Sequence, residues 1–313
     1  MKRGLVEWDE QEVPRGTLDS RLEQVRTWGR EQGLDAVLFH TSDSHTQPVR
    51  YLTHFLLYWN EGVLIVPCSE DAEPVLVYGL SGRVIEWVRR TSTLTQAVTA
   101  RDIGAAVASL LAERSWQRIG VAEPASFPAP VVACLPTWTD ASAVLRSLSL
   151  DGVDAERALR GRAEQLCHTG LARVQPEHTQ AQATAAFCGT ARLGGAEDVS
   201  LLIGEPPAWP GLPREGRLPN NAFLLGRVEY KGAWHQAART LGVPTTPDWF
   251  ADLVEGLRPG GRVGDLHVQD VGGPAPFRRL APDAVLRAGV VVAVTALRGS
   301  VLWGETLQLP GTD

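Results

Sequence analysis

The sequence is poor in the features that mark several large classes of protein. Its 313 residues include only four cysteines, Cys68, Cys134, Cys167 and Cys188, which lie far apart and form no CxxC pair. This spacing argues against a zinc ribbon or a disulfide framework, and it favours buried thiols in a reducing cytoplasm. No run of Lys or Arg is long enough to follow a phosphate backbone, and the formal net charge is -6, so no nucleic-acid partner is expected.

Long apolar runs are also absent. The longest, around residues 288–297, is about half the length that a bilayer span needs. Residues 1–12 contain no apolar stretch after their basic pair, so they do not resemble a secretory signal. We therefore expect a cytoplasmic protein with no membrane partner. The GxSxG, GxxxxGK[ST] and HExxH motifs are missing too, as is a GxGxxG ahead of a helix, which removes the commonest hydrolase and nucleotide-binding signatures.

The composition that remains, 44% hydrophobic and 21% charged, is that of a globular protein, and the length suits two domains. The first half alternates between helical and strand patterns, which is typical of a layered α/β unit. A helix capped by Asp19 or Ser20 and ending at Gly33 comes first. Strands are then predicted at residues 35–39, 61–67, 74–78 and 118–122, and helices at residues 83–90 and 103–114, the latter capped by Asp102.

The second half has a different character, beginning with two successive helical patterns at residues 154–173 and 179–193. A strand at residues 199–204, a proline-rich stretch at residues 205–219 and a hairpin around Lys231-Gly232 follow. Thr246-Pro247 predicts the start of a helix that runs to residue 257, and two strands at residues 290–297 and 301–309 end the chain. We place the boundary so that the domains are residues 1–150 and 151–313.

Several short stretches resemble one known family. Residues 229–240, which contain Glu-Tyr-Lys-Gly and Ala-Arg-Thr, are similar to the stretch D-x-G-x-E-Y-x-G-Y-x-x-D-x-T-R-T of aminopeptidase P and prolidase. Residues 267–273 resemble D-V-H-D-V-G-G, residues 286–291 resemble L-x-x-G-M-V, and residues 304–306 resemble the end of R-I-E-D. Residues 33–37 and 50–53 resemble the family's opening G-L-D-A-x and x-Y-L-T-G-F. In this order they indicate the creatinase–prolidase–aminopeptidase P family of pita-bread peptidases.

The resemblance implies an α/β (α+β) protein: an N-terminal creatinase-type α/β domain followed by a C-terminal pita-bread domain, assembled as a homodimer. The family's two-metal site uses two Asp, one His and two Glu. Carried over one at a time, these ligands fall on Leu225, Gln236, Arg262, Thr295 and Glu305. A substrate-facing His of the family falls on Gly211.

Only Glu305 in this set is a usual metal ligand. Leu225 has no lone pair, Gln236 and Thr295 are neutral, and Arg262 is a permanent cation that repels a metal ion. We therefore predict no metal cofactor, and no dinuclear centre in particular. Creatinase has the same fold and works without metal, but its chemistry needs the His that Gly211 replaces and a Glu that Thr295 replaces, so a metal-free hydrolase of that kind is also disfavoured.

Other residues have two readings each. His235 and Glu305 are the catalytic candidates, with His235 either a new general base or a histidine that lies at the surface or supports the residues around the old ligand positions. Trp209 either lines a ligand cleft or fills a core, and Arg239 either packs or joins Gly211 and Arg262 at that cleft. Arg262, with Arg239 or Arg298, is expected to make the cleft prefer anions.

The prediction is thus a protein similar to Xaa-Pro dipeptidases that does not catalyse their reaction and binds a peptide or small carboxylate instead. Two alternatives stay open: a metal-free, creatinase-like hydrolase, and a true Xaa-Pro dipeptidase with a non-standard site. Metal content separates the last from the other two, and turnover separates the first two.

Overall fold

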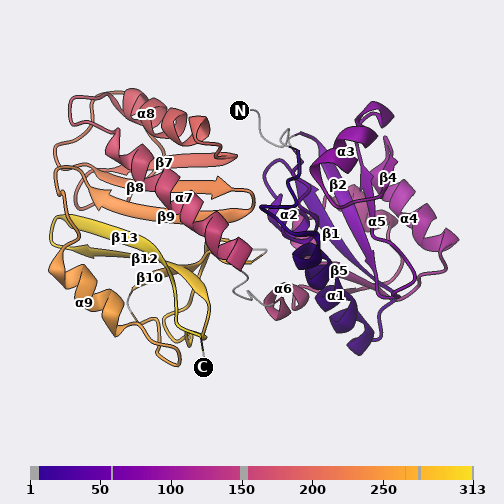
Figure 1. Cartoon of the computed structure of the whole chain (residues 1–313). Helices are drawn as coiled ribbons and strands as arrows, with labels where there is room; N and C mark the ends of the chain where they lie inside the picture. Colours follow the sequence, from indigo (N-terminus) through magenta and orange to yellow (C-terminus); the bar gives the residue numbers. More distant parts are fainter. Residues whose placement is uncertain (1–6, 58, 149–153, 265, 274–275, 312–313) are drawn as a thin grey trace. The chain divides into compact units, whose positions relative to one another are not determined.

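The computed structural model describes residues 7–57, 59–148, 154–264, 266–273 and 276–311. The chain divides into two compact units, residues 2–149 and 150–313. The boundary that the sequence predicted, between residues 150 and 151, lies outside the described residues. Each unit is built around its own sheet (Figure 1).

The N-terminal unit is a mixed six-stranded sheet in the order β4-β3-β2-β1-β5-β6. Strand β1 is antiparallel to β2 and parallel to β5, and β3 is parallel to β4. The strands are β1 (Ala36–Ser42), β2 (Glu61–Pro67), β3 (Val75–Tyr78), β4 (Gln96–Thr99), β5 (Ile119–Ala122) and β6 (Trp138–Asp140). The helices are α1 (Arg15–Glu31), α2 (Gln47–Thr53), α3 (Ile85–Thr91), α4 (Ile103–Glu113), α5 (Ala129–Cys134) and α6 (Val144–Ser147), with short 3-10 turns at Gly82–Val84 and Pro124–Ser126.

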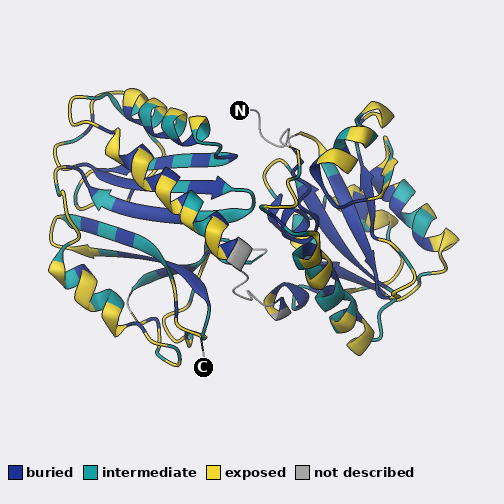
Figure 2. Ribbon diagram, in the orientation of Figure 1, coloured by how far each residue is buried: buried dark blue, intermediate teal, exposed yellow. Residues whose placement is uncertain are grey.

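Both faces of this sheet are covered, which is why its central strands are buried almost throughout (Figure 2). One core packs Phe39, Leu64 and Val25 of α1 together, and the other packs Leu38, Ile65 and Val107 of α4. The Asp102 cap is confirmed, since its carboxylate accepts from the backbone N–H of Ala105 at 2.9 Å. The predicted cap of α1 is wrong. The helix begins at Arg15, directly after Pro14, whose fixed φ suits a helix start without a side-chain cap.

The C-terminal unit is an antiparallel seven-stranded sheet in the order β11-β10-β12-β13-β9-β8-β7. Its strands are β7 (Asp198–Gly204), β8 (Phe223–Tyr230), β9 (Ala233–Thr240), β10 (His267–Asp270), β11 (Arg278–Arg279), β12 (Val291–Arg298) and β13 (Val301–Gln308). Its helices are α7 (Asp154–Ala172), α8 (Gln180–Leu193) and α9 (Asp248–Gly256). Lys231 and Gly232 both have positive φ, so β8 and β9 join through the tight hairpin that the sequence predicted.

The two faces of this sheet have different neighbours. On what we call the helix face, Leu224, Val228 and Ala237 pack with α7 and α8, and Val292 and Val294 pack with Phe250 of α9. On the opposite side, which we call the inner face, Phe223, Leu225 and Ala238 pack with Leu302 of β13. Figure 1 shows α7 running across β8 and β9. Because side chains of a strand alternate between faces, each residue's face follows from its strand register.

Among the described residues, no helix combines the length and the apolar character needed to span a bilayer. The four cysteines are free thiols, and Cys68 and Cys167 are buried as expected. Cys134 is exposed at the end of the short helix α5, so the prediction of a buried thiol is wrong at that position.

Candidate functional site

The inner face holds three of the positions at which the sequence resemblance places metal ligands. Leu225 of β8 lies opposite Ala238 of β9 in the strand register. Gln236 of β9 lies on the same face, and its amide nitrogen donates to the hydroxyl of Thr295 at 3.3 Å. All three residues are 1% exposed. The fold therefore gathers Leu225, Gln236 and Thr295.

A pair of metal ions does not fit these side chains. Leu225 packs against Phe223, Ala238 and Leu302, and it offers no donor atom. The side-chain amide of Gln236 is already hydrogen-bonded at both ends. Its oxygen accepts from Arg227, and its nitrogen donates to the Thr295 hydroxyl. Bridging two dications requires carboxylates, which neutral amide and hydroxyl groups do not replace.

Arg227 places a positive charge on this face, and the sequence analysis did not single it out. Its Nε donates to the side-chain oxygen of Gln236 at 2.7 Å, across the register pair that joins β8 to β9. Its guanidinium also lies 4.3 Å above the centre of the Phe277 ring. Burial lowers the pKa of Arg227, although the group stays charged at neutral pH. Among the described residues, no carboxylate pairs with it.

The missed signal was local. Arg227 follows Leu225 by two residues, and in a strand this spacing puts both side chains on one face.

Aromatic rings and a histidine surround this charge. The ring of Trp234 meets Phe277 edge-on at 5.0 Å, and the ring of Trp209 lies 4.7 Å from that of His267. His267 pairs directly with Thr295 between β10 and β12. Burial and the nearby charges of Arg279 and Arg227 lower the pKa of His267, so its ring is neutral at pH 7. Trp209 is 43% exposed, which excludes the reading that it fills a core.

Glu305 lies on the other side of the sheet. In the register of β12 and β13 it is opposite Val294, a residue of the helix face, whereas its neighbour Gly304 is opposite Thr295. A Cβ added to Gly304 would lie 2.8 Å from the Thr295 hydroxyl and 3.1 Å from Ala238, so position 304 is the one that faces inward. The expectation that Glu305 joins the other ligand positions is therefore wrong, because a shift of one residue along a strand reverses the face.

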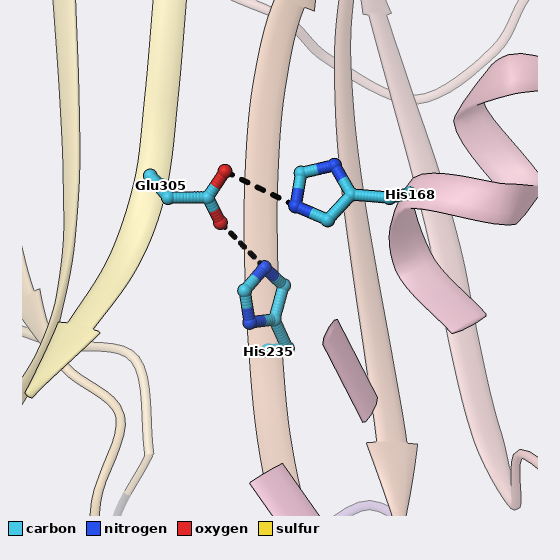
Figure 3. Close-up of side chains that lie close together, drawn as sticks. All are labelled: His168, His235 and Glu305. Carbon is cyan, nitrogen blue, oxygen red and sulfur yellow. Dashed lines mark ion pairs between the residues drawn. The ribbon is translucent and has the colours of Figure 1, made fainter. Parts of the chain in front are cut away.

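On the helix face, Glu305 meets two histidines (Figure 3). Its two carboxylate oxygens lie 2.6 Å from Nε2 of His235 and 3.1 Å from Nε2 of His168. Burial alone would raise the pKa of Glu305, but the contacts with His168 and His235 outweigh burial and hold it at about 2. The same contact with Glu305 raises the pKa of His168. His235 is 2% exposed, so the surface reading of this residue is wrong.

His168 was also missed in the sequence. It lies on α7, far along the chain from β9 and β13, and it belongs to no recognisable motif. Only the packing of α7 on β9 brings it to His235, at 5.4 Å between ring centres. No pattern in the sequence could have indicated this cluster.

The remaining predicted cleft residues are dispersed. Arg239 follows His235 and Ala237 at strand spacing, so it belongs to the helix face, and its charge acts on His168. The expectation that it faces the cleft is therefore wrong. Arg262 makes a backbone bridge to Val285, and Gly211 makes one to Ile203 at the end of β7. Arg298 is exposed at the turn between β12 and β13.

The chain was compared with known protein families, curated proteins and solved structures. No family model matches the sequence, and no curated protein matches it. Solved structures do match over nearly the whole chain. An Xaa-Pro dipeptidase from Bacillus anthracis aligns with a TM-score of 0.68 at 16% identity, covering 94% of this chain and 95% of that one. A prolidase from Pyrococcus furiosus aligns with a TM-score of 0.69 at 13% identity, covering 92% of this chain and 96% of that one.

An X-Pro aminopeptidase from Thermotoga maritima aligns with a TM-score of 0.67 at 12% identity, covering 93% of this chain and 95% of that one. The chain has the prolidase fold. The predicted α/β fold class, an N-terminal unit followed by a pita-bread unit, is thereby confirmed.

Proposed function

We propose that this protein is a prolidase-like binding protein that does not cleave peptides, and that it holds a peptide or small carboxylate on the inner face of its C-terminal sheet. The observation that carries this proposal is Arg227, a half-buried guanidinium for which the side-chain oxygen of Gln236 is the acceptor. A carboxylate is the natural partner for such a group, because the two can form a pair of parallel, charge-assisted hydrogen bonds.

The surrounding groups favour a ligand with apolar parts. Phe277 offers aromatic surface against Arg227, Trp234 packs on Phe277, and Trp209 packs on His267. Aromatic rings bind proline and other apolar side chains well. The neighbours of this fold are named for Xaa-Pro substrates, so a dipeptide ending in proline is the first ligand to test.

Two features argue against hydrolysis on the inner face. Leu225, Gln236 and Thr295 are unsuited to a dinuclear metal centre, so we propose that this face carries none. The metal-free alternative needs an accessible general base. His235 is paired with Glu305 on the helix face and is almost fully buried, which puts it out of reach of a ligand beside Arg227. His267 does lie on the inner face, with its ring against Trp209, and the turnover measurement below tests it as a base.

Titration calorimetry tests the proposal. Dipeptides ending in proline should bind the wild type more tightly than their C-terminal amides, and Arg227→Met should remove that preference. Arg258→Met is the matched control, because Arg258 is an exposed arginine whose side chain, among the described residues, hydrogen-bonds the carbonyl of the adjacent Leu257. Equal binding of acids and amides by the wild type would overturn the carboxylate site.

Turnover is measured separately. Incubation of the protein with Xaa-Pro dipeptides, with and without added Mn²⁺, should release no free proline. Release that is proportional to enzyme concentration would show that the protein is a peptidase after all.

We also propose a homodimer, by analogy with the family that the sequence resembles. Light scattering at micromolar concentration should give twice the chain mass of 33.9 kDa. A monomer mass would contradict this part of the proposal and would leave the ligand site untouched.

A further inference from the structure

The helix face carries a cluster that the proposed ligand site does not use. His168 of α7, His235 of β9 and Glu305 of β13 each present one donor atom, and these atoms all lie within 4.8 Å of one another. The three side chains come from separate elements and point to a common centre (Figure 3). We propose that they form a mononuclear site for a divalent transition-metal ion of the kind that Zn²⁺ represents.

The donor set suits such an ion. Two imidazoles and one carboxylate are the protein ligands of several zinc sites, and the same set also binds Fe²⁺ and Co²⁺. Zinc–nitrogen and zinc–oxygen bonds are about 2.0–2.2 Å, so donors around a tetrahedral ion lie roughly 3.3 Å apart. The Glu305 oxygens lie 3.1 Å from Nε2 of His168 and 2.6 Å from Nε2 of His235, so these two pairs must open slightly to admit an ion, while any donor pair near the 4.8 Å limit must close.

Solvent exposure increases from His235 through Glu305 to His168. His235 is buried beneath α7 and fixed by the sheet, so it forms the floor of the site. The side chains of Glu305 and His168 are 24% and 47% exposed, which leaves a side open to solvent. An ion can enter from that side, and a water molecule can supply the fourth ligand there, as in sites with three protein ligands.

The local charges favour a cation on balance. Glu164 lies one helical turn before His168 on α7, and its negative charge acts on that histidine. Arg239 is the opposing positive charge within the cluster's surroundings. Two carboxylates therefore face one guanidinium, and Glu305 lies in direct contact with the donors while Arg239 does not bond to them.

This site is distinct from the one that the sequence resemblance describes. Gln236 and Thr295 lie on the inner face, and His235 and Glu305 lie on the helix face of the same strands. The proposal therefore predicts one metal equivalent per chain, in contrast to two for the family's centre and none for a purely structural ion-pair cluster.

The test uses the full chain without a histidine tag, stripped with a chelator and titrated with ZnCl₂ by calorimetry. The wild type should bind one equivalent, and Zn²⁺ should raise its melting temperature. His168→Gln and Glu305→Gln should each weaken Zn²⁺ binding by at least about tenfold, since loss even of an outer partner costs 10–100-fold. Both positions are partly exposed, so these variants should fold, which circular dichroism would check.

His178→Gln is the control, because His178 is a partly exposed histidine just before α8 and is not one of the three donors. It should bind Zn²⁺ as the wild type does. Failure of the wild type to bind a saturable equivalent would overturn the proposal, and so would binding that survives unchanged in both His168→Gln and Glu305→Gln.

Discussion

His235 and Gln236 are consecutive residues of β9, and their side chains lie on opposite faces of the seven-stranded sheet. Gln236 hydrogen-bonds Thr295 on the inner face, whereas His235 contacts Glu305 on the helix face. This alternation separates two sites that the sequence analysis had treated as one. It also gives each site its own experimental signature, because a substitution on one face should leave the other face unaffected.

The bond between Gln236 and Arg227 provides the first prediction. Gln236→Ala should lower the free energy of unfolding by about 1–3 kcal/mol, because it leaves a half-buried guanidinium without its acceptor. Urea denaturation measures the loss. Gln308→Ala is the matched control, since Gln308 accepts a similar bond from Arg160 at an exposed position. Gln308→Ala should change the free energy of unfolding by no more than about 0.5 kcal/mol. Equal losses in the two variants would show that Arg227 does not depend on Gln236.

A second prediction tests the face of Glu305. The fourfold variant combines Leu225→Asp, Gln236→Asp and Thr295→Glu, which put carboxylates on the inner face, with Arg262→His at the position that the resemblance assigns to the family's His ligand. The variant should be less stable than the wild type without metal, because the Leu225 position is buried and an unpaired carboxylate there is costly. Added Mn²⁺ should restore part of that stability. Thermal unfolding with and without Mn²⁺ measures both effects.

Glu305 should contribute nothing to that rebuilt site. In a His168→Gln background, which removes any helix-face ion, Glu305→Gln should leave the Mn²⁺-dependent stabilisation of the fourfold variant unchanged. A clear loss of stabilisation would mean that Glu305 reaches the inner face, contrary to its register opposite Val294.

The outcome for Glu305 shows where sequence reasoning stopped. The order of elements was predictable, because periodic apolar patterns and turn residues are local signals, and β2 was predicted with its observed bounds. The face on which Glu305 lies was not predictable, because it depends on how β13 is aligned with its neighbouring strands. Motifs as short as Gly304-Glu305-Thr306 leave a one-residue ambiguity that reverses the side chain.

Arg227 and His168 were missed for different reasons. The position of Arg227 could have been predicted, since strand spacing alone places it on the same face as Leu225. His168 was not, because its role arises only from the packing of α7 on β9. The helix that Thr246-Pro247 predicted begins at Asp248 and ends at Gly256, one residue before the predicted end. Helix boundaries are the least certain part of such assignments.

A third prediction concerns Asp35, which holds the start of β5 in the N-terminal unit. Its carboxylate accepts from the Arg118 guanidinium at 2.6 Å and from the backbone N–H groups of Gln117 and Arg118. The Arg118 guanidinium, together with those N–H groups and against burial, lowers the pKa of Asp35 to about 2. Because the Arg118 side chain is exposed and solvent screens the pair, Asp35→Asn should cost on the order of 1 kcal/mol at pH 7.

The sign of its pH dependence follows from the lowered pKa. The stabilisation by Asp35 is fully present above the ordinary value of 3.8 and is lost as the pH falls towards about 2. The difference in unfolding free energy between wild type and Asp35→Asn should shrink over that window. Asp71→Asn, an exposed aspartate of the same unit, is the control and should change little. A difference that stays constant down to pH 2 would contradict the assignment.

The last prediction concerns His40, at the end of β1. It is 5% exposed, its ring packs against Phe127, and neither of its ring nitrogens has a hydrogen-bond partner among the described residues. Burial, aided by the neighbouring His45, lowers the pKa of His40 to about 4. The Glu61 carboxylate of β2 lies 3.5 Å from Nε2 and opposes this shift, and Glu123 at the end of β5 faces His45 at 3.2 Å. Burial outweighs these acidic groups.

Because the folded state keeps His40 neutral, protonation favours unfolding. Between the ordinary pKa of 6.5 and about 4, the unfolded chain binds a proton that the folded chain does not, so stability falls as the pH is lowered. The loss should amount to on the order of 3 kcal/mol across that window. His40→Leu removes the titrating group and should flatten this part of the profile, while stability at pH 7 changes little because no hydrogen bond is lost. Urea denaturation at a series of pH values from 4 to 7 measures both, with His178→Leu as a control that keeps the wild-type slope. Parallel profiles for wild type and His40→Leu would show that the imidazole is already charged in the folded protein, held by Glu61 after all.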